Sequence, residues 1–381
     1  MWTLIRSLTA PFFSMVLLIL ASGLHNTYTS LKLEIDHNSP ETIGYVVSAL
    51  YLGVFLGSFW VDRWISKFGL VRSYMACIAA ITLIVLLQSL WVEPIFWSVL
   101  RLLIGIFTAG IFIIIESWVL VQSTPQQRGT ILSLYLALYY GAQSSGQLLI
   151  NLADPASVIP LWIVAFISSL SVLPLIKISS AIVPNIENPT RLKTGALFRI
   201  SPFGLAGVFI SGILLAAIYG LVPIYAKEIG LSISEIGNLM AILIFGGLCF
   251  QWPLGKLADI RSRHKVLLLA TILTAILSLM ITQNTSANIL YLLIFLFGGF
   301  SFTIYPLSMA YACEKVSDDQ IISATSGFVL FYGAGAIAGP LMAPIAMTYC
   351  GHNGLFYFLT ALSIVLALFG LKRNGASVSQ Q

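Results

Sequence analysis

Residues 255–265 read Gly-Lys-Leu-Ala-Asp-Ile-Arg-Ser-Arg-His-Lys, and this stretch decides how the chain folds. Apolar segments flank it on both sides, roughly at residues 232–254 and 266–284. Each segment holds about 20 mostly apolar residues, which is the length that a helix needs to cross a bilayer. The stretch is therefore predicted to be a short connection between two transmembrane helices.

The composition of the whole chain agrees with this interpretation. Hydrophobic residues make up 58% of the 381 positions and charged residues only 9%, whereas about a quarter of a soluble domain is charged. A soluble fold of this length could not bury so much apolar surface, so secreted, cytosolic and disordered proteins are excluded. The net charge of +5 comes without a dense basic run, which argues against nucleic-acid binding.

The apolar pattern repeats along the chain and predicts an all-α polytopic membrane protein with twelve transmembrane helices. Polar or Pro/Gly-rich stretches separate the segments. The first segment is longer than the core of a signal peptide, so we expect it to be retained. The predicted spans are roughly 9–31, 41–61, 72–91, 95–120, 129–151, 158–178, 203–226, 232–254, 266–284, 288–312, 321–347 and 354–372.

The positions of the basic residues predict the orientation in the membrane. If the N-terminus lies in the cytoplasm, sixteen Lys and Arg residues fall on the cytoplasmic side, and only Lys32 and Lys227 fall outside. Such an asymmetry is typical of cytoplasmic loops. We therefore expect a multi-pass protein of the inner (plasma) membrane with both termini in the cytoplasm, and the lipid bilayer as its main surrounding partner.

An internal repeat divides the twelve spans into six and six. The loop at residues 62–72 lies 193 positions before residues 255–265, so that Ser66 matches Asp259 and Arg72 matches Lys265. Tyr-Gly-Ala follows in both halves, starting at Tyr140 and Tyr332. This pattern predicts a duplicated architecture. The expected domains are an N-terminal six-helix bundle at 1–178, a cytoplasmic linker at 179–202, a C-terminal six-helix bundle at 203–373 and a cytoplasmic tail at 374–381.

Twelve spans, two halves and the Gly-x-Leu-Ala-Asp loop resemble the major facilitator superfamily (MFS), and several stretches are similar to its YcaD-type subfamily. The resemblance implies two pseudo-symmetric six-helix bundles around a central cavity, with substrate near the middle of the membrane and alternating access. It predicts no particular substrate. The stretches that carry the resemblance to the subfamily are Glu116-Ser-Trp, Gln127-Arg-Gly, Tyr139-Tyr-Gly, Gly146-Gln-Leu-Leu, Tyr219-Gly-Leu-Val-Pro, Gln251-Trp-Pro-Leu-Gly, Phe302-Thr-Ile-Tyr-Pro and Ala312-Cys-Glu-Lys.

The same resemblance implies a cytoplasmic gate built from the two related loops. Asp259 would accept from helix N-terminal amides, and Arg261 and Arg263 would pair with acids on neighbouring helix ends in one conformation only. The first loop departs from the pattern, because Asp62 stands where a glycine is usual and Ser66 where an aspartate is usual. The alternative is that both loops are topology signals. The expected gate residues are Asp62, Arg63, Lys67, Gly69, Arg72, Gly255, Asp259, Arg261, Arg263 and Lys265.

Two charged residues, Arg101 and Glu116, lie inside the fourth span, where charges are costly and usually functional. They are about 60° apart around a helix. Arg101 and Gly105 resemble the RxxxG element of the superfamily, which is associated with proton coupling. Arg101 is a candidate either for helix packing or for coupling and anion binding. Glu116 is a candidate either for neutralising gate bases or for exchanging a proton.

Uncharged polar residues predict a substrate cavity. Tyr135, Tyr139, Gln143 and Gln147 recur at a spacing of four and therefore share one face of the fifth span. Gly141 and Ser145 predict close helix packing on another face. The alternative role for each polar residue is interhelical hydrogen bonding, and for His25 a packing role competes with a pH-sensitive one. The candidate cavity residues are His25, Asn26, Tyr139, Gln143, Tyr219, Tyr305 and Tyr332.

Signals for enzymes, metals and cofactors are missing from the sequence. The four cysteines lie far apart with no CxxC pair, and no phosphate-binding GxxxxGK[ST] stretch occurs. We therefore expect no enzymatic activity, no metal and no cofactor, with a proton gradient as the driving force. The sequence predicts a monomeric secondary transporter of a small solute.

Two alternatives compete with this function. One is efflux of amphipathic compounds by proton antiport, although the Gly-Pro pair that is usual in the fifth span of such antiporters occurs here only at 339–340. The other is a non-transporting membrane sensor or scaffold that keeps the transporter fold.

Overall fold

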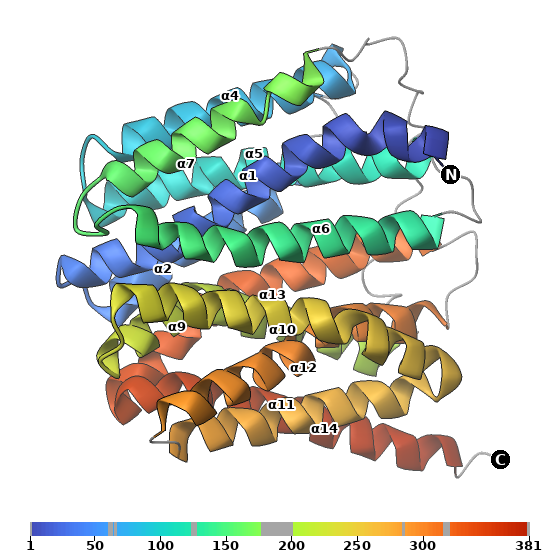
Figure 1. Ribbon diagram of the computed structural model, residues 1–381. Helices are drawn as coiled ribbons and strands as arrows, with labels where there is room; N and C mark the ends of the chain where they lie inside the picture. Colours follow the sequence, from blue (N-terminus) through green and yellow to red (C-terminus); the bar gives the residue numbers. More distant parts are fainter. Residues whose placement is uncertain are drawn as a thin grey trace. The chain divides into compact units, whose positions relative to one another are not determined.

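The computed structural model describes residues 2–59, 64, 67–122, 128–176, 201–283, 286–314 and 321–378. These residues form α-helices and short 3₁₀ turns, and no strand occurs among them. The helices are α1 (Trp2–Ile35), α2 (Pro40–Gly57), α4 (Leu70–Gln88), α5 (Pro94–Gln122), α6 (Arg128–Leu148), α7 (Ile159–Leu170), α9 (Pro202–Glu228), α10 (Ile233–Ile260), α11 (Arg263–Gln283), α12 (Ala287–Cys313), α13 (Ile321–Cys350) and α14 (Gly354–Val378) (Figure 1).

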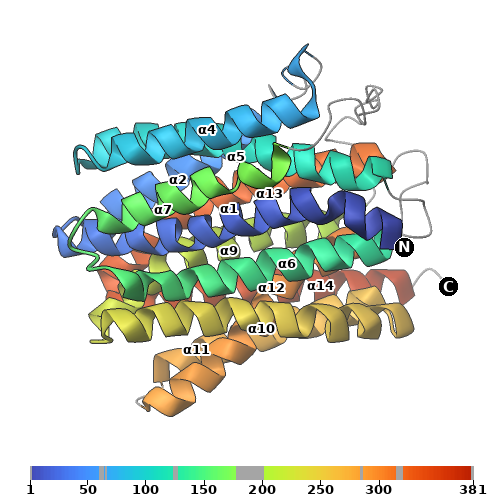
Figure 2. The same cartoon turned by 45° about the horizontal axis from the view of Figure 1, so that its top comes forward.

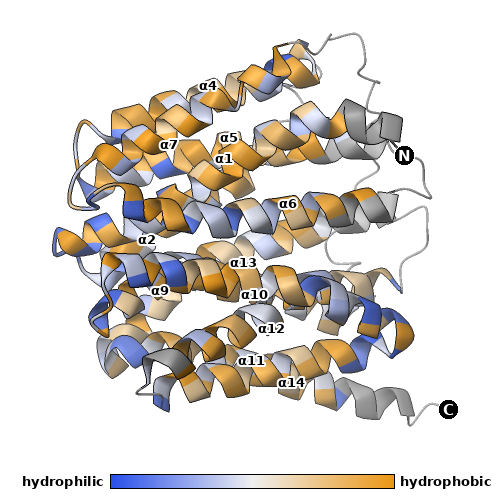
Figure 3. Cartoon of the chain, viewed as in Figure 1, coloured by the Kyte–Doolittle hydropathy of each residue, from blue (hydrophilic) through white to orange (hydrophobic). Residues whose placement is uncertain are grey.

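Each of the twelve predicted spans coincides with one of these helices. Within the described residues, nine helical segments are long and apolar enough to cross a membrane, and the segment Gly327–Lys372 runs through both α13 and α14. The predicted sixth span is shorter than expected, because α7 ends at Leu170 and a 3₁₀ turn follows at Leu173–Leu175. Apolar residues dominate the helices and hydrophilic ones gather toward helix ends, as in the last turns of α10 (Figure 3). The predicted fold class is confirmed.

The chain divides into two compact units. The first unit contains residues 1–187 and 231–241, and the second contains residues 188–230 and 242–381. Helix α10 therefore begins in the first unit and continues in the second. In the first unit α1 packs on α6 and α7, while α4 packs on α5 and α7 (Figure 2).

Glycines allow the helices of the first unit to cross at backbone distance. A Cβ atom added to Gly105 on α5 would overlap the carbonyl oxygen of Leu50 on α2, and one added to Gly146 on α6 would overlap that of Leu20 on α1. Such positions admit no side chain. The predicted packing residues Gly141 and Ser145 are wrong, because Ser145 is exposed and a Cβ at Gly141 would meet open space. Gly146 is the residue that makes the close contact.

The second unit repeats these crossings at equivalent positions. A Cβ atom added to Gly298 on α12 would overlap the carbonyl oxygen of Leu243 on α10, 193 positions after the pair Gly105 and Leu50. The crossing of α9 with α13 matches that of α1 with α6 at an offset of 189, because Gly335 meets the carbonyl of Phe209. The internal repeat is therefore visible in how the helices touch.

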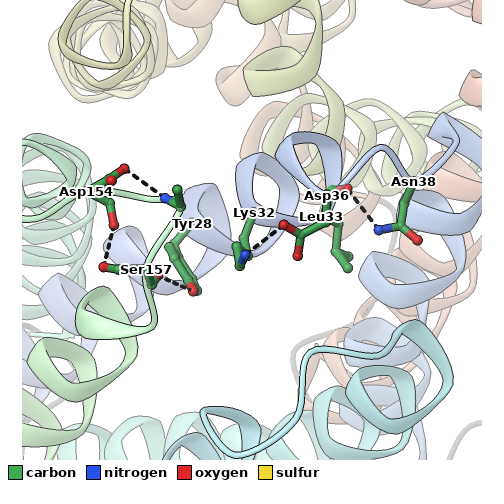
Figure 4. A network of polar contacts seen from close by, with 8 residues as sticks. Tyr28, Lys32, Leu33, Asp36, Asn38, Asp154 and Ser157 are labelled. Carbon is green, nitrogen blue, oxygen red and sulfur yellow. Dashed lines mark hydrogen bonds and ion pairs between the residues drawn. The ribbon is translucent and has the colours of Figure 1, made fainter.

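Polar contacts fix the last turns of α1 in the first unit (Figure 4). Tyr28 donates its hydroxyl proton to the carbonyl oxygen of Ser157 over 2.9 Å, which ties α1 to the loop before α7. Lys32 pairs over 2.7 Å with Asp36, which directly follows the end of α1. The contact of Tyr28 holds the second half of α1, which also carries the next group of polar residues, against the loop before α7.

Candidate functional site

Arg101 lies about two turns into the apolar helix α5 and is only 2% exposed. Its two terminal nitrogens point at side chains of α1. Nη2 donates to Oδ1 of Asn26 over 2.8 Å, and Nη1 lies 3.4 Å from Nδ1 of His25. The amide of Asn26 is uncharged, and the imidazole of His25 is uncharged when only one of its ring nitrogens carries a proton. No carboxylate pairs with Arg101 within the part of the chain that the structure describes, and its Nε is buried without a hydrogen-bond partner.

His25 connects Arg101 to α4. Its Nε2 lies 2.9 Å from Oε1 of Gln88, the last residue of α4, and both side chains are buried. The indole of Trp97 donates to the main-chain oxygen of Gln88 over 3.1 Å, which holds this end of α4 against α5. The amide nitrogen Nε2 of Gln88 is buried without a partner. His25, Asn26, Gln88 and Arg101 therefore form one chain of contacts, which we call the polar group.

The edge of the polar group is more open than its centre. Asn26, Tyr51 on α2 and Tyr139 on α6 are half-buried. Tyr51 interacts electrostatically with both Arg101 and Tyr139. The ring of Tyr139 packs on Phe112 with 5.8 Å between ring centroids. The structure thus brings together four residues that the sequence singled out, namely His25, Asn26, Arg101 and Tyr139.

Tyr139 belongs to the set of four residues on α6, Tyr135, Tyr139, Gln143 and Gln147, that were expected to share one helix face. Gln147 is fully buried and accepts a hydrogen bond from Thr27 on α1. Gln143 and Tyr135 are also buried. Three of the four residues at this spacing are thus buried, and Tyr139 is the most exposed of the four.

The three predicted cavity tyrosines of the second half lie in the second unit. Tyr305 on α12 and Tyr332 on α13 form an edge-to-face pair with 4.9 Å between ring centroids, and both pack on an apolar cluster that includes Val208 and Phe328. Tyr219 packs edge-to-face on Phe302. All three therefore have aromatic neighbours, and their role in a cavity stays a prediction.

Two of the expected gate residues of the second loop, Asp259 and Arg263, contact each other at the start of α11. The guanidinium of Arg263 contacts Asp259 on α10 over 3.2 Å and Glu314, just after α12, over 3.3 Å. It also donates to the carbonyl oxygen of Ala310 over 3.1 Å. Arg263 thereby joins three helix ends of the second unit. Arg261 and Lys265 are exposed, and a Cβ at Gly255 would meet open space.

The first loop is described only in part. Gly69 has a φ of 79° and precedes α4, a conformation that favours glycine, and Lys67 and Arg72 are exposed. Asp62, Arg63 and the side chain of Glu116 lie outside the described residues. Among the residues that are described, no group of three or more His, Cys, Asp or Glu side chains could hold a metal ion.

Sequence reasoning missed Gln88 and Tyr51. Gln88 carries a usable signal, because it is a polar amide inside the predicted third span, and polar groups in a membrane need partners. Tyr51 carries no such signal, since aromatic residues are common throughout these spans.

Comparisons with known proteins agree with the fold and with the repeat. The family model described as Major Facilitator Superfamily matches residues 11–203 and again residues 204–379. The chain is 32% identical over 370 residues to a protein of Escherichia fergusonii named "Uncharacterized MFS-type transporter YcaD", covering 96% of this chain and 95% of the relative. It is 31% identical over 368 residues to the protein of the same name in Escherichia coli O139:H28, covering 95% and 94%.

Solved structures show the same fold at low identity. The nucleoside transporter NupG superposes with a TM-score of 0.74 at 15% identity, covering 95% of this chain and 98% of the other. A D-xylose-proton symporter superposes with a TM-score of 0.73 at 14% identity, covering 96% of each chain. With a family match that spans both halves and relatives above 30% identity over nearly the full length, this multi-pass membrane protein belongs to the Major Facilitator Superfamily of transporters.

Proposed function

We propose that the protein is a proton-coupled secondary transporter that moves a small solute across the inner membrane by alternating access, and that it is not an enzyme. The observation that carries the proposal is the polar group. A buried arginine within a transmembrane helix is costly, and membrane proteins keep such residues at substrate or ion pathways. Here Arg101 is in contact with His25, a side chain whose imidazole can gain and lose a proton.

A flux assay in liposomes tests this function. The purified protein is reconstituted with a pH-sensitive dye inside, an inward proton gradient is imposed, and sugars, nucleosides, amino acids, organic acids and lipophilic cations are added in turn. We expect at least one solute to change the rate of proton entry, and Arg101→Gln to abolish that change. Lys372→Gln serves as a matched control, because Lys372 is exposed at the end of α14.

The outcomes separate the alternatives. Flux that only lipophilic cations evoke, with protons moving in the opposite direction, would assign efflux by antiport. No solute-dependent flux in any class would contradict transport and favour a sensor or scaffold.

The orientation is part of the proposal and has its own test. With both termini in the cytoplasm, α13 would run outward and end at Cys350, which is exposed. Cys249 is also exposed but lies within α10, and Cys77 is buried. In intact spheroplasts we expect a membrane-impermeant maleimide to label the protein at Cys350. Cys350→Ser should remove this labelling, and labelling only after lysis would reverse the orientation.

A further inference from the structure

The charge balance of the polar group points to the kind of solute, an inference that rests on the proposed function. Arg101 is 2% exposed, and its contacts are the neutral oxygen of Asn26 and a ring nitrogen of His25. A buried cation without a counter-ion is unfavourable. Two donors of the polar group, Nε of Arg101 and Nε2 of Gln88, are buried without partners. The group therefore offers an excess of positive charge and of hydrogen-bond donors.

The contacts also determine where the proton of His25 lies. A guanidinium only donates hydrogen bonds, so Nδ1 of His25 must accept from Arg101 and cannot carry a proton. The single ring proton then lies on Nε2 and is donated to Oε1 of Gln88, which directs the amide hydrogens of Gln88 away from His25. In this arrangement His25 is neutral.

Protonation of His25 would change this arrangement. A proton on Nδ1 would remove the acceptor of Arg101 and place two cations side by side, 3.4 Å apart. The other titratable groups near the pair are Tyr51 on α2 and Tyr139 on α6, which are neutral at physiological pH. The charged residues that follow His25 along the chain are Lys32, Glu34 and Asp36, and of these Lys32 pairs with Asp36. Within the described residues, no carboxylate forms an ion pair with Arg101 or His25.

We propose that the polar group binds a small organic carboxylate on Arg101 together with a proton on His25. A carboxylate accepts two parallel hydrogen bonds from a guanidinium, and it would supply the missing negative charge. Its presence removes the penalty for protonating His25, and a proton on His25 in turn favours the anion. By linkage each ligand raises the affinity for the other, which couples the carboxylate to the proton gradient. The half-buried edge at Asn26, Tyr51 and Tyr139 is the side from which the solute would enter.

Paired probes that differ in charge test the substrate class. Binding to the purified protein in detergent is measured by the shift in thermal unfolding with sodium lactate against lactamide, sodium benzoate against benzamide, and sodium gluconate against glucose, with sodium chloride for ionic strength. We expect at least one carboxylate to bind and its neutral partner not to. Arg101→Gln should weaken that binding about 100-fold, and Arg101→Lys should lose less because it keeps the charge.

The pH dependence tests the coupling and separates it from a structural role. Carboxylate affinity of the wild type should rise about tenfold from about pH 8 to about pH 6. His25→Gln can keep both hydrogen bonds but cannot take up a proton, so it should bind with little dependence on pH. His264→Gln is the matched control, because His264 is the buried histidine that packs on Phe203 in the second unit, and it should retain the wild-type profile.

Distinct outcomes would overturn the inference or the proposed function. Equal binding of carboxylates and amides, absence of carboxylate binding, or wild-type affinity in Arg101→Gln overturns the carboxylate site. An unchanged pH profile in His25→Gln overturns the role of His25. Proton-coupled flux with neutral solutes alone would leave the proposed transport function standing while this inference fails, whereas absence of flux with every solute contradicts the transport function itself.

Discussion

Arg101 in the first unit and Ile294 in the second occupy equivalent places on α5 and α12, 193 positions apart. Each is buried, and each lies one turn before a glycine that crosses a neighbouring helix, Gly105 or Gly298. The comparison extends to the partners of Arg101. Gln88 corresponds to Ile281 at the same offset, and both side chains are buried.

The equivalent of His25 is apolar as well. At the offset of 189 that relates the crossings of α1 and α9, His25 corresponds to Leu214, which is fully buried. One helix framework therefore holds a cationic polar group in the first unit and aliphatic side chains in the second. The duplication supplies the scaffold, and the chemistry lies in residues that break the repeat.

The largest effect is expected from placing the arginine in the wrong unit. Ile294→Arg would bury a cation where the neighbouring positions Leu214 and Ile281 offer no hydrogen-bond acceptor. Insertion of arginine into the apolar part of a membrane helix costs up to about 3 kcal/mol. We expect a large drop in folded yield and in unfolding temperature in detergent.

Ile294→Met is the matched control for that experiment. It keeps the volume and apolar character of the side chain and should cost less than about 1.5 kcal/mol. If Ile294→Arg were as stable as the wild type, the interior of the second unit would accept a buried cation as the first unit does, and the contrast between the two units would be wrong.

The next largest loss of stability is expected at the glycine crossings, which occur at equivalent positions in both units. Gly105→Ala and Gly298→Ala each add a methyl group that overlaps a backbone carbonyl of the facing helix. Overpacking of this kind costs about 1–3 kcal/mol, because the helices must separate. Both variants should unfold at similarly reduced temperatures in detergent. Gly141→Ala should show no loss of stability, since its Cβ would meet open space. If Gly298→Ala left the unfolding temperature unchanged while Gly105→Ala lowered it, the two helix crossings would not be equivalent.

Most of the fold could be predicted from the sequence, for a physical reason. A helix that crosses a bilayer needs a long apolar segment, so the twelve spans are visible as hydropathy, and the charged loops between them give their ends. The failure at Gly141 and Ser145 is equally informative. Helical spacing groups residues on one face but does not say which face meets which neighbour, so Gly146 was not recognised as the crossing residue.

The candidate site was predictable only in part. A charge inside an apolar span is conspicuous, which singled out Arg101, and its contact with His25 and Asn26 joins residues about 75 positions apart. No local pattern encodes that pairing. Gln88 shows the same limit, because its polarity is visible in the sequence while its partner on α1 is not.

A smaller effect is expected from a hydrogen bond between helices of the first unit. Thr27→Val removes the donor to Gln147 and leaves a buried amide oxygen without its partner. Hydrogen bonds between membrane helices contribute about 0.6 kcal/mol on average, so we expect a reduction of about 1 kcal/mol or less. The unfolding temperature measures it. Thr29→Val should change less, because the hydroxyl of Thr29 bonds the carbonyl oxygen of His25 on its own helix. Equal losses would show that the contact with α6 adds nothing.

The smallest effect on stability is expected at the charged end of the second unit. Arg263 is part-exposed, and its partners Asp259 and Glu314 are more exposed still. Ion pairs in such settings contribute about 0.2–1 kcal/mol and are screened by salt. Arg263→Gln should therefore lower the unfolding temperature slightly at low salt and hardly at all at high salt, and Arg261→Gln, at an exposed neighbour, should do neither. A loss comparable to that of Gly298→Ala would mean that this cluster is structurally essential. A small loss of stability combined with a large change in flux would instead assign the Arg263 cluster to the movement between conformations, so that each unit would contribute its own charged group to transport.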